Sequence, residues 1–291
     1  MMELDKDTKK KLLTAQRNEI TEHFIYDRLA NSMKEGNNKK VLKQISEDEL
    51  RHYGVWKEFT KEDVEPSKWK IFKYYWISKI FGLTFGIKLM EKGEEGAQVN
   101  YSNLSEFIAV AKKIEKEENE HEKKLIDMID EEKLKYVGSV VLGLNDALVE
   151  LTGALAGFTL ALQRTSLIAV TGLITGIAAS LSMAASEYLS TKSEETGKNP
   201  IKASVYTGIA YVLTVMFLIF PYLIFSNIYA ALGLTLFNAI IVILIFTYYI
   251  SVARDLSFKR RFFEMAVISL SVAVLSFFIG YAVNVLFNVD L

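Results

Sequence analysis

Two copies of one short pattern place a carboxylate beside an imidazole. Glu49 and His52 are three residues apart, and Glu118 and His121 repeat the spacing. On a helix, positions i and i+3 lie on the same face, so each pair presents both groups on one side. Two such helices, with one glutamate from each of two partner helices, form the carboxylate site for two iron ions in a four-helix bundle. The spacing therefore predicts a di-iron site.

A second repeated spacing supplies the two remaining glutamates. Glu19 precedes the first pair and Glu94 precedes the second, and a tyrosine follows each glutamate after seven residues, at Tyr26 and Tyr101. Glu91 lies one helical turn before Glu94 and is an additional or alternative ligand. We expect the tyrosines to support the ligands through hydrogen bonds or packing.

Iron accepts both carboxylate oxygen and imidazole nitrogen, whereas calcium and magnesium prefer oxygen alone. Manganese accepts similar ligands and is the alternative metal. We expect Glu49 and Glu118 to bridge two metals, with one histidine on each metal and the other glutamates as terminal ligands. The predicted metal ligands are Glu19, Glu49, His52, Glu94, Glu118 and His121, with Glu91 as the alternative.

Helical periodicity places these residues on four helices, expected at 8–35, 39–61, 84–100 and 106–135. Two further polar residues on the first helix are left out of the site. We expect His23 to lie at the surface or to support a ligand, and Glu22 to be solvated.

Residues 67–90 are rich in aromatic side chains and lysine and contain no acidic residue. One interpretation is a hydrophobic crossover helix packed on the bundle. The other is a segment lying along a bilayer surface, because Trp, Tyr and Lys favour that interface. The sequence alone leaves both open.

Charge divides the 291-residue chain in two. Residues 1–135 hold 26 of the 34 Lys and Arg and 27 of the 35 Asp and Glu, which leaves 8 of each for 136–291. The second part contains five apolar stretches near the ~20 residues that cross a bilayer. They are 136–162, 166–190, 203–226, 229–253 and 263–287. We therefore expect an all-α chain, with a helical bundle over 1–135 and a five-helix transmembrane domain over 136–291.

Composition also excludes several chemistries. No cysteine occurs, so disulfides, thiolate metal sites and a rubredoxin-type iron site are excluded. The balanced charge gives no indication of a nucleic-acid partner. Basic residues instead gather in the loop after the second span and the loop after the fourth. Both loops lie on the side of residues 1–135, which the positive-inside rule makes the cytoplasm, with the C-terminus on the opposite side.

The spans contain ionisable residues, which are costly at membrane depth and usually mark an ion or proton path. Asp146 and Glu150 lie one turn apart in the first span, and Met183 and Glu187 share a face of the second. A thioether next to a carboxylate suits Fe(II). The alternative is that both first-span acids lie near the cytoplasmic interface and extend toward water.

With the residues described above, 1–135 resembles the rubrerythrin branch of the ferritin-like family. The stretch His121-Glu122-Lys123 after Glu118 adds to the likeness. The resemblance implies a ferritin-like bundle that binds Fe(II), and it leaves open oxidation by oxygen or peroxide. The lack of a rubredoxin-type site argues against a self-contained peroxidase.

Residues 136–291 resemble the vacuolar iron transporter family. The matching parts are Asn145-Asp146, Ser182-Met183, 186–190, Asn199-Pro200 and Pro221. The resemblance implies a homodimer that moves Fe(II), or Mn(II), out of the cytosol in exchange for protons, with Asp146, Met183 and Glu187 on the path. Eukaryotic members carry a glutamate-rich domain after the second span, and here only 191–199 fills that gap. We expect the bundle to replace that domain, as in the membrane-bound ferritin class of iron exporters.

The sequence thus predicts a multi-pass exporter of the cell membrane that takes cytosolic Fe(II) from a di-iron bundle. No residue is assigned as catalytic. The alternative is a membrane-anchored ferroxidase or peroxidase of the rubrerythrin type, with the spans chiefly as an anchor.

Overall fold

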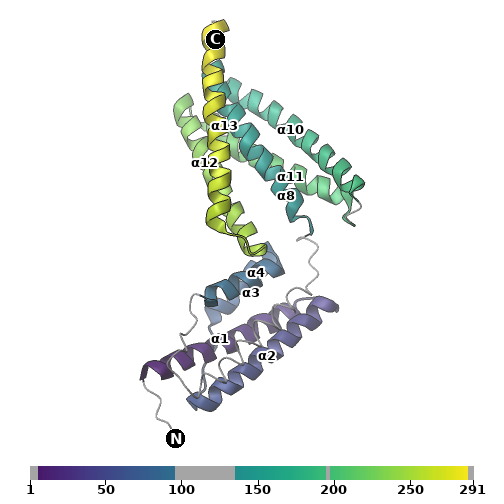
Figure 1. Ribbon diagram of the computed structural model, residues 1–291, viewed down its shortest axis with the longest axis vertical. Helices are drawn as coiled ribbons and strands as arrows, with labels where there is room; N and C mark the ends of the chain where they lie inside the picture. Colours follow the sequence, from purple (N-terminus) through teal and green to yellow (C-terminus); the bar gives the residue numbers. More distant parts are fainter. Residues whose placement is uncertain (1–5, 96–134, 195–196, 288–291) are drawn as a thin grey trace. The chain divides into compact units, whose positions relative to one another are not determined.

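The computed structural model describes residues 6–95, 135–194 and 197–287, and these residues form helices and no strand (Figure 1). Two compact units divide the chain, residues 1–132 and 133–291. The chain is therefore all-α, as the periodicity predicts.

In the first unit, α1 (Lys6–Asn31) and α2 (Asn37–Thr60) form an antiparallel pair (Figure 1). The turn between them is short and contains Gly36. Apolar residues at helical spacing, including Ile25 and Leu29 of α1 and Leu42 and Ile45 of α2, are buried in one cluster. Helix α2 ends where Lys61 adopts a left-handed conformation and its N–H donates to the carbonyl of Lys57.

The predicted third bundle helix is preceded by a separate helix. Helix α3 (Lys68–Phe81) follows Pro66 and is capped by Ser67, whose side chain accepts from the Lys70 N–H. Gly82 has a φ of 111°, which ends α3, and α4 (Leu83–Glu95) begins at once. The fourth bundle helix, expected at 106–135, lies outside the described residues except for Lys135.

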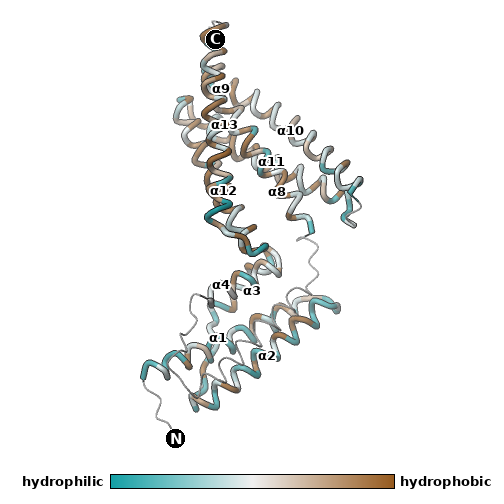
Figure 2. Tube along the Cα trace, viewed as in Figure 1, coloured by the Kyte–Doolittle hydropathy of each residue, from teal (hydrophilic) through white to brown (hydrophobic). Residues whose placement is uncertain are grey.

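The described residues of the second unit contain five apolar spans, each long enough to cross a membrane (Figure 2). Their segments are α8 (Val137–Asp146), η3 (Ala147–Leu151) and α9 (Thr152–Leu162) in the first span, then α10 (Thr165–Ser193), α11 (Pro200–Ile224), α12 (Ile228–Ala253) and α13 (Phe258–Phe287). Asn199 and Asn227 cap α11 and α12 by accepting two backbone N–H groups each. The protein is therefore a multi-pass membrane protein.

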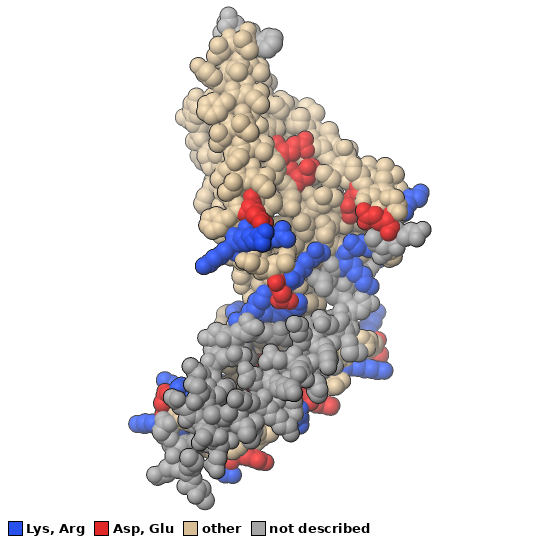
Figure 3. All heavy atoms as spheres, in the orientation of Figure 1, with Lys and Arg blue, Asp and Glu red and all other residues tan. Residues whose placement is uncertain are grey.

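Three chain segments meet at one end of the second unit. The hydroxyl of Tyr136, just before α8, accepts a hydrogen bond from the Asn199 N–H at 3.1 Å. The Arg254 guanidinium, just after α12, lies near Gly138. The start of the first span and both basic loops therefore share one end, and Figure 3 shows basic side chains gathered there.

Candidate metal centre

Helices α1 and α2 bring Glu19, Glu49 and His52 together. The Nδ1 atom of His52 lies 3.6 Å from Oε2 of Glu19 and 3.8 Å from Oε2 of Glu49. The three residues are buried, with 8%, 3% and 3% of their surface exposed. Each offers one ligand atom, and these atoms lie within 4.8 Å of one another.

The donor set of this group fits a transition metal. Two carboxylates supply negative charge and the imidazole supplies nitrogen, which iron and manganese both accept. Within the described part of the chain, no other group of three or more such residues comes this close together. Glu19, Glu49 and His52 can therefore hold one metal ion between the two helices.

Trp56, one turn after His52, fixes the position of Glu19. Its indole Nε1–H donates to Oε1 of Glu19 at 3.0 Å, so Oε2 faces His52. Burial alone would raise the pKa of Glu19, but hydrogen bonds with His52, Glu49 and Trp56 outweigh it and hold the pKa below its usual value. Glu19 is therefore a carboxylate at neutral pH, as a metal ligand requires.

The other predicted ligands lie beyond what the structure describes. Glu91 and Glu94 belong to α4, but their side chains are outside the described residues. Glu118 and His121 also lie outside the described residues, as does Tyr101. The second half of the di-iron site therefore stays a prediction.

Two residues that follow Glu19 on α1, Tyr26 and Glu22, are both buried. Tyr26 is fully buried in the apolar cluster of the first unit. The prediction that Glu22 is solvated is wrong, because only 8% of its surface is exposed. Glu22 lies three residues after Glu19 and four before Tyr26, so it shares their buried helix face.

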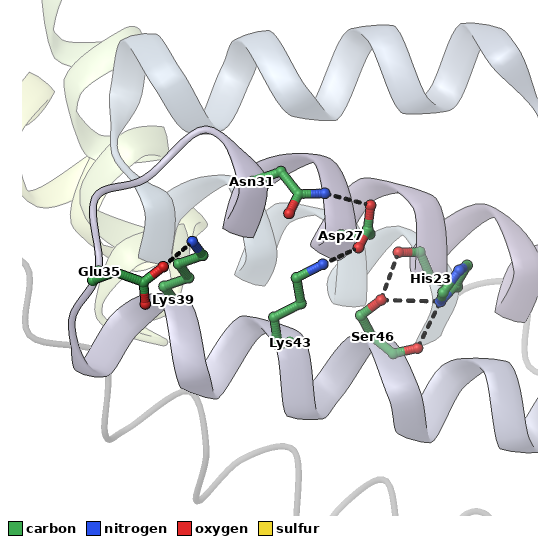
Figure 4. Close-up of polar contacts among 7 residues, drawn as sticks. All are labelled: His23, Asp27, Asn31, Glu35, Lys39, Lys43 and Ser46. Atoms are coloured by element: carbon green, nitrogen blue, oxygen red, sulfur yellow. Dashed lines mark hydrogen bonds and ion pairs between the residues drawn. The ribbon is translucent and has the colours of Figure 1, made fainter.

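His23 serves to join the two helices. Its Nδ1 lies 2.8 Å from the carbonyl oxygen of Ser46, so Nδ1 carries the proton and donates, and the Ser46 hydroxyl donates to the His23 carbonyl (Figure 4). One turn on, Asp27 accepts from Lys43 across the same helix pair. His23 is thus bound to α2 and is not part of the Glu19, Glu49 and His52 group.

Of the membrane acids, Glu187 lies at the end of the unit that carries the basic loops. Its Oε1 accepts a hydrogen bond from the Ser139 hydroxyl at 2.5 Å, and the Thr191 hydroxyl lies 3.5 Å away. Ser139 is in the first turn of α8. Met183, one turn deeper along α10, packs against the apolar core of the second unit.

A short π-helix interrupts the first span where Asp146 and Glu150 lie. Asp146 ends α8, and Glu150 lies within the π-helix η3, a distortion that is frequent at functional sites. The hydroxyl of Tyr211, a fully buried residue of α11, donates to Oε2 of Glu150 at 3.2 Å. Asp146 lies seven residues after Ser139, the residue that is hydrogen-bonded to Glu187. At 1.5 Å per residue, Asp146 is therefore about 10 Å farther along the span than Glu187.

Sequence reasoning missed three residues that hold these acids in place: Trp56, Ser139 and Tyr211. Signals for two of them exist in the sequence. Trp56 follows His52 at i+4, so it must share the ligand face, and Tyr211 is a polar ring in the middle of an apolar span. Ser139 gives no comparable signal, because serine is common in packed membrane helices.

Two family models match the chain. The rubrerythrin model matches residues 10–137, and the VIT family model matches residues 137–198. The chain is therefore similar to rubrerythrin over its first part and to the VIT family over the segment that follows. The second match covers the first two spans and most of the loop after them, and α11 to α13 lie beyond it. No curated protein matches the chain.

These matches agree with the two family resemblances that the residues and motifs indicate. A rubrerythrin domain indicates di-iron binding, and a VIT-family segment indicates transport of iron or a related metal ion across a membrane. The buried group of Glu19, Glu49 and His52 lies inside the rubrerythrin match, and Asp146, Glu150, Met183 and Glu187 lie inside the VIT match.

Proposed function

We propose that the protein exports Fe(II) from the cytosol across the cell membrane, and that its rubrerythrin-type domain captures the ion first. The observation that carries the proposal is the presence, on one chain, of a buried Glu19, Glu49 and His52 group and of carboxylates within membrane helices. The functional division falls near residue 135. Residues 1–135 bind iron as a di-iron bundle, and residues 136–291 transport it.

The transport path runs from Glu187 toward the middle of the membrane helices. Glu187 lies at the end of the unit where the basic loops meet, and Met183 and Asp146 follow at increasing depth. Glu150 lies about one turn beyond Asp146, held by Tyr211. A succession of oxygen ligands with one thioether lets Fe(II) move without staying at any single tight site.

Protons drive the release of the ion. A carboxylate must lose its proton to bind a metal, so protons entering from the outer side lower the affinity of Asp146 and Glu150 for Fe(II). The same groups then return the protons to the cytosol when the next ion binds. This exchange makes export depend on the proton gradient.

The orientation and assembly complete the proposal. The basic loops and residues 1–135 lie in the cytosol, and the C-terminus lies outside. The transporter works as a homodimer, as the resemblance to vacuolar iron transporters implies. Mn(II) is an alternative cargo, because it accepts the same ligands.

Transport by proteoliposomes tests the path. Full-length protein is reconstituted with a proton gradient and an Fe(II)-sensitive dye inside the vesicles. Asp146→Asn removes a charged ligand, and we expect the initial rate of Fe(II) entry to fall at least about tenfold. The matched control is Glu264→Gln, which removes an exposed carboxylate paired with Arg260 and should transport normally. Equal rates for Asp146→Asn and the wild type would contradict the path.

The enzyme alternative is tested on the same preparation. A membrane-anchored ferroxidase would consume oxygen as Fe(II) is added, while no Fe(II) would reach the dye inside the vesicles. Oxygen consumption is therefore recorded together with dye response. Competition between Fe(II) and Mn(II) for entry into the vesicles then identifies which ion is transported.

A further inference from the structure

Helix α3 presents one face of large apolar side chains to the outside. Trp69, Phe72, Trp76 and Ile80 recur at i, i+3, i+7 and i+11, which places them on one side of the helix. Between 47% and 70% of the surface of each is exposed. We call these four residues the aromatic face. Such a contiguous exposed patch usually marks a surface that binds a protein or a membrane.

The opposite side of α3 fixes this orientation. Tyr74 and Ser78 are buried, and Ser78 packs so closely on Gly86 of α4 that a Cβ there would collide with it. The aromatic face forms a continuous row, with ring centroids 6.2 Å apart for Trp69 and Phe72 and 6.4 Å apart for Phe72 and Trp76. The packing therefore holds the face outward as a preformed surface.

Positive charge surrounds this face. The segment from Pro66 to Met90 has five lysines and no acidic residue, whereas the rest of residues 1–135 has more acidic than basic residues. Lys68, Lys73 and Lys79 are exposed on α3 beside the aromatic rings. Tryptophan and lysine together are the side chains that favour the headgroup region of a bilayer, and lysine also binds anionic lipid.

We propose that the aromatic face of α3 inserts into the headgroup region of an anionic leaflet, with its lysines on the lipid phosphates. The five spans already anchor the chain in a bilayer, so the effective concentration of lipid surface for α3 is high. A second copy of the chain fits the face poorly. A two-fold contact through α3 would place its lysines against the same lysines of the partner.

The tryptophans of the chain provide a direct test. All three, Trp56, Trp69 and Trp76, precede the membrane spans, and Trp56 is 2% exposed. Full-length protein is reconstituted in phosphatidylglycerol vesicles brominated near the carboxyl end of the acyl chain, because bromine quenches tryptophan on contact. We expect strong quenching of the wild type. The double variant Trp69→Phe and Trp76→Phe keeps only Trp56 and should lose most of it.

Two further measurements identify whether anionic lipid covers the aromatic face. The triple variant Lys68→Gln, Lys73→Gln and Lys79→Gln should lower quenching at least about twofold in the same vesicles, because each lysine near an anionic surface stabilises binding. Unchanged quenching in this variant would overturn the role given to charge. Wild-type fluorescence that bromine leaves intact would overturn the proposal. In that case, acrylamide accessibility separates a face open to water from a face covered by protein.

Discussion

Trp56 fixes which oxygen of Glu19 meets a metal ion. Its indole binds Oε1, so Oε2 is left facing His52, at 3.6 Å from Nδ1. Partners of this kind orient ligands, and their loss typically lowers metal affinity by about 10–100-fold. The hydrogen bond from Trp56 therefore preorganises Glu19 for metal binding together with Glu49 and His52.

Trp56→Phe tests this positioning role. The change removes the donor but keeps an aromatic ring, and we expect the affinity for Fe(II) or Mn(II) to fall about tenfold. Calorimetric titration of the full chain with Mn(II) measures it. Trp69→Phe, at an exposed position, is the control and should bind normally. Equal affinities for the two variants would mean that the indole contributes packing alone.

At this scale, the sequence predicts that Glu49 and His52 lie together, because helical spacing is a local property. The i, i+3 relation of Glu49 and His52 needs no knowledge of the rest of the fold. The pairing of Glu19 with them depends on how α1 and α2 align, which the repeated spacing indicates indirectly. The error at Glu22 came from treating a charged residue as solvated, although its helical position places it beside buried residues.

The elements of the second unit are held together by close backbone approach. A Cβ on Gly143 of α8 would lie 2.5 Å from the Thr207 carbonyl oxygen of α11. Gly280 of α13 meets the backbone of Gly157 of α9 even more closely. Small residues allow such contacts between membrane helices, where packing rather than the hydrophobic effect drives association. The Thr207 hydroxyl adds a hydrogen bond to the Ser139 carbonyl at 2.9 Å.

Gly143→Ala tests the contact between α8 and α11. The added methyl group must push the helices apart, and overpacking of this kind costs about 1–3 kcal/mol. We expect the full-length protein in detergent to unfold several degrees lower, measured by size-exclusion profiles after heating. Gly233→Ala is the matched control, because nothing lies within 4 Å of a Cβ there. A melting temperature unchanged in Gly143→Ala would contradict the close packing.

Hydropathy predicts five membrane helices because each apolar run is a property of its own segment. It does not predict the π-helix η3, since an i→i+5 turn depends on the packing of neighbouring helices. It also does not separate α3 from α4, although Gly82 offers a local signal for that break. Within the described residues, pattern therefore gives the type of each element and the five spans, while the irregularities of the helices follow from tertiary contacts.

At the scale of the whole molecule, the proposal requires one topology. The start of the first span, the loop from α10 to α11 and the loop from α12 to α13 share one end of the second unit. Five spans then place Phe287, the last residue of α13, at the other end. Delivery of Fe(II) from the rubrerythrin-type domain to Glu187 requires that the domain and this end face the same compartment.

Cysteine labelling tests this topology cleanly, because the chain contains no cysteine. Single variants are made at exposed residues: Thr14→Cys in α1, Ser193→Cys at the end of α10, Ser257→Cys before α13, Ser166→Cys in α10 and Ser226→Cys before α12. The first three should react with a membrane-impermeant maleimide only from the cytoplasmic side, and the last two only from outside. Reaction of Thr14→Cys and Ser193→Cys from opposite sides would separate the metal site from the acids of the membrane helices and exclude direct transfer between them.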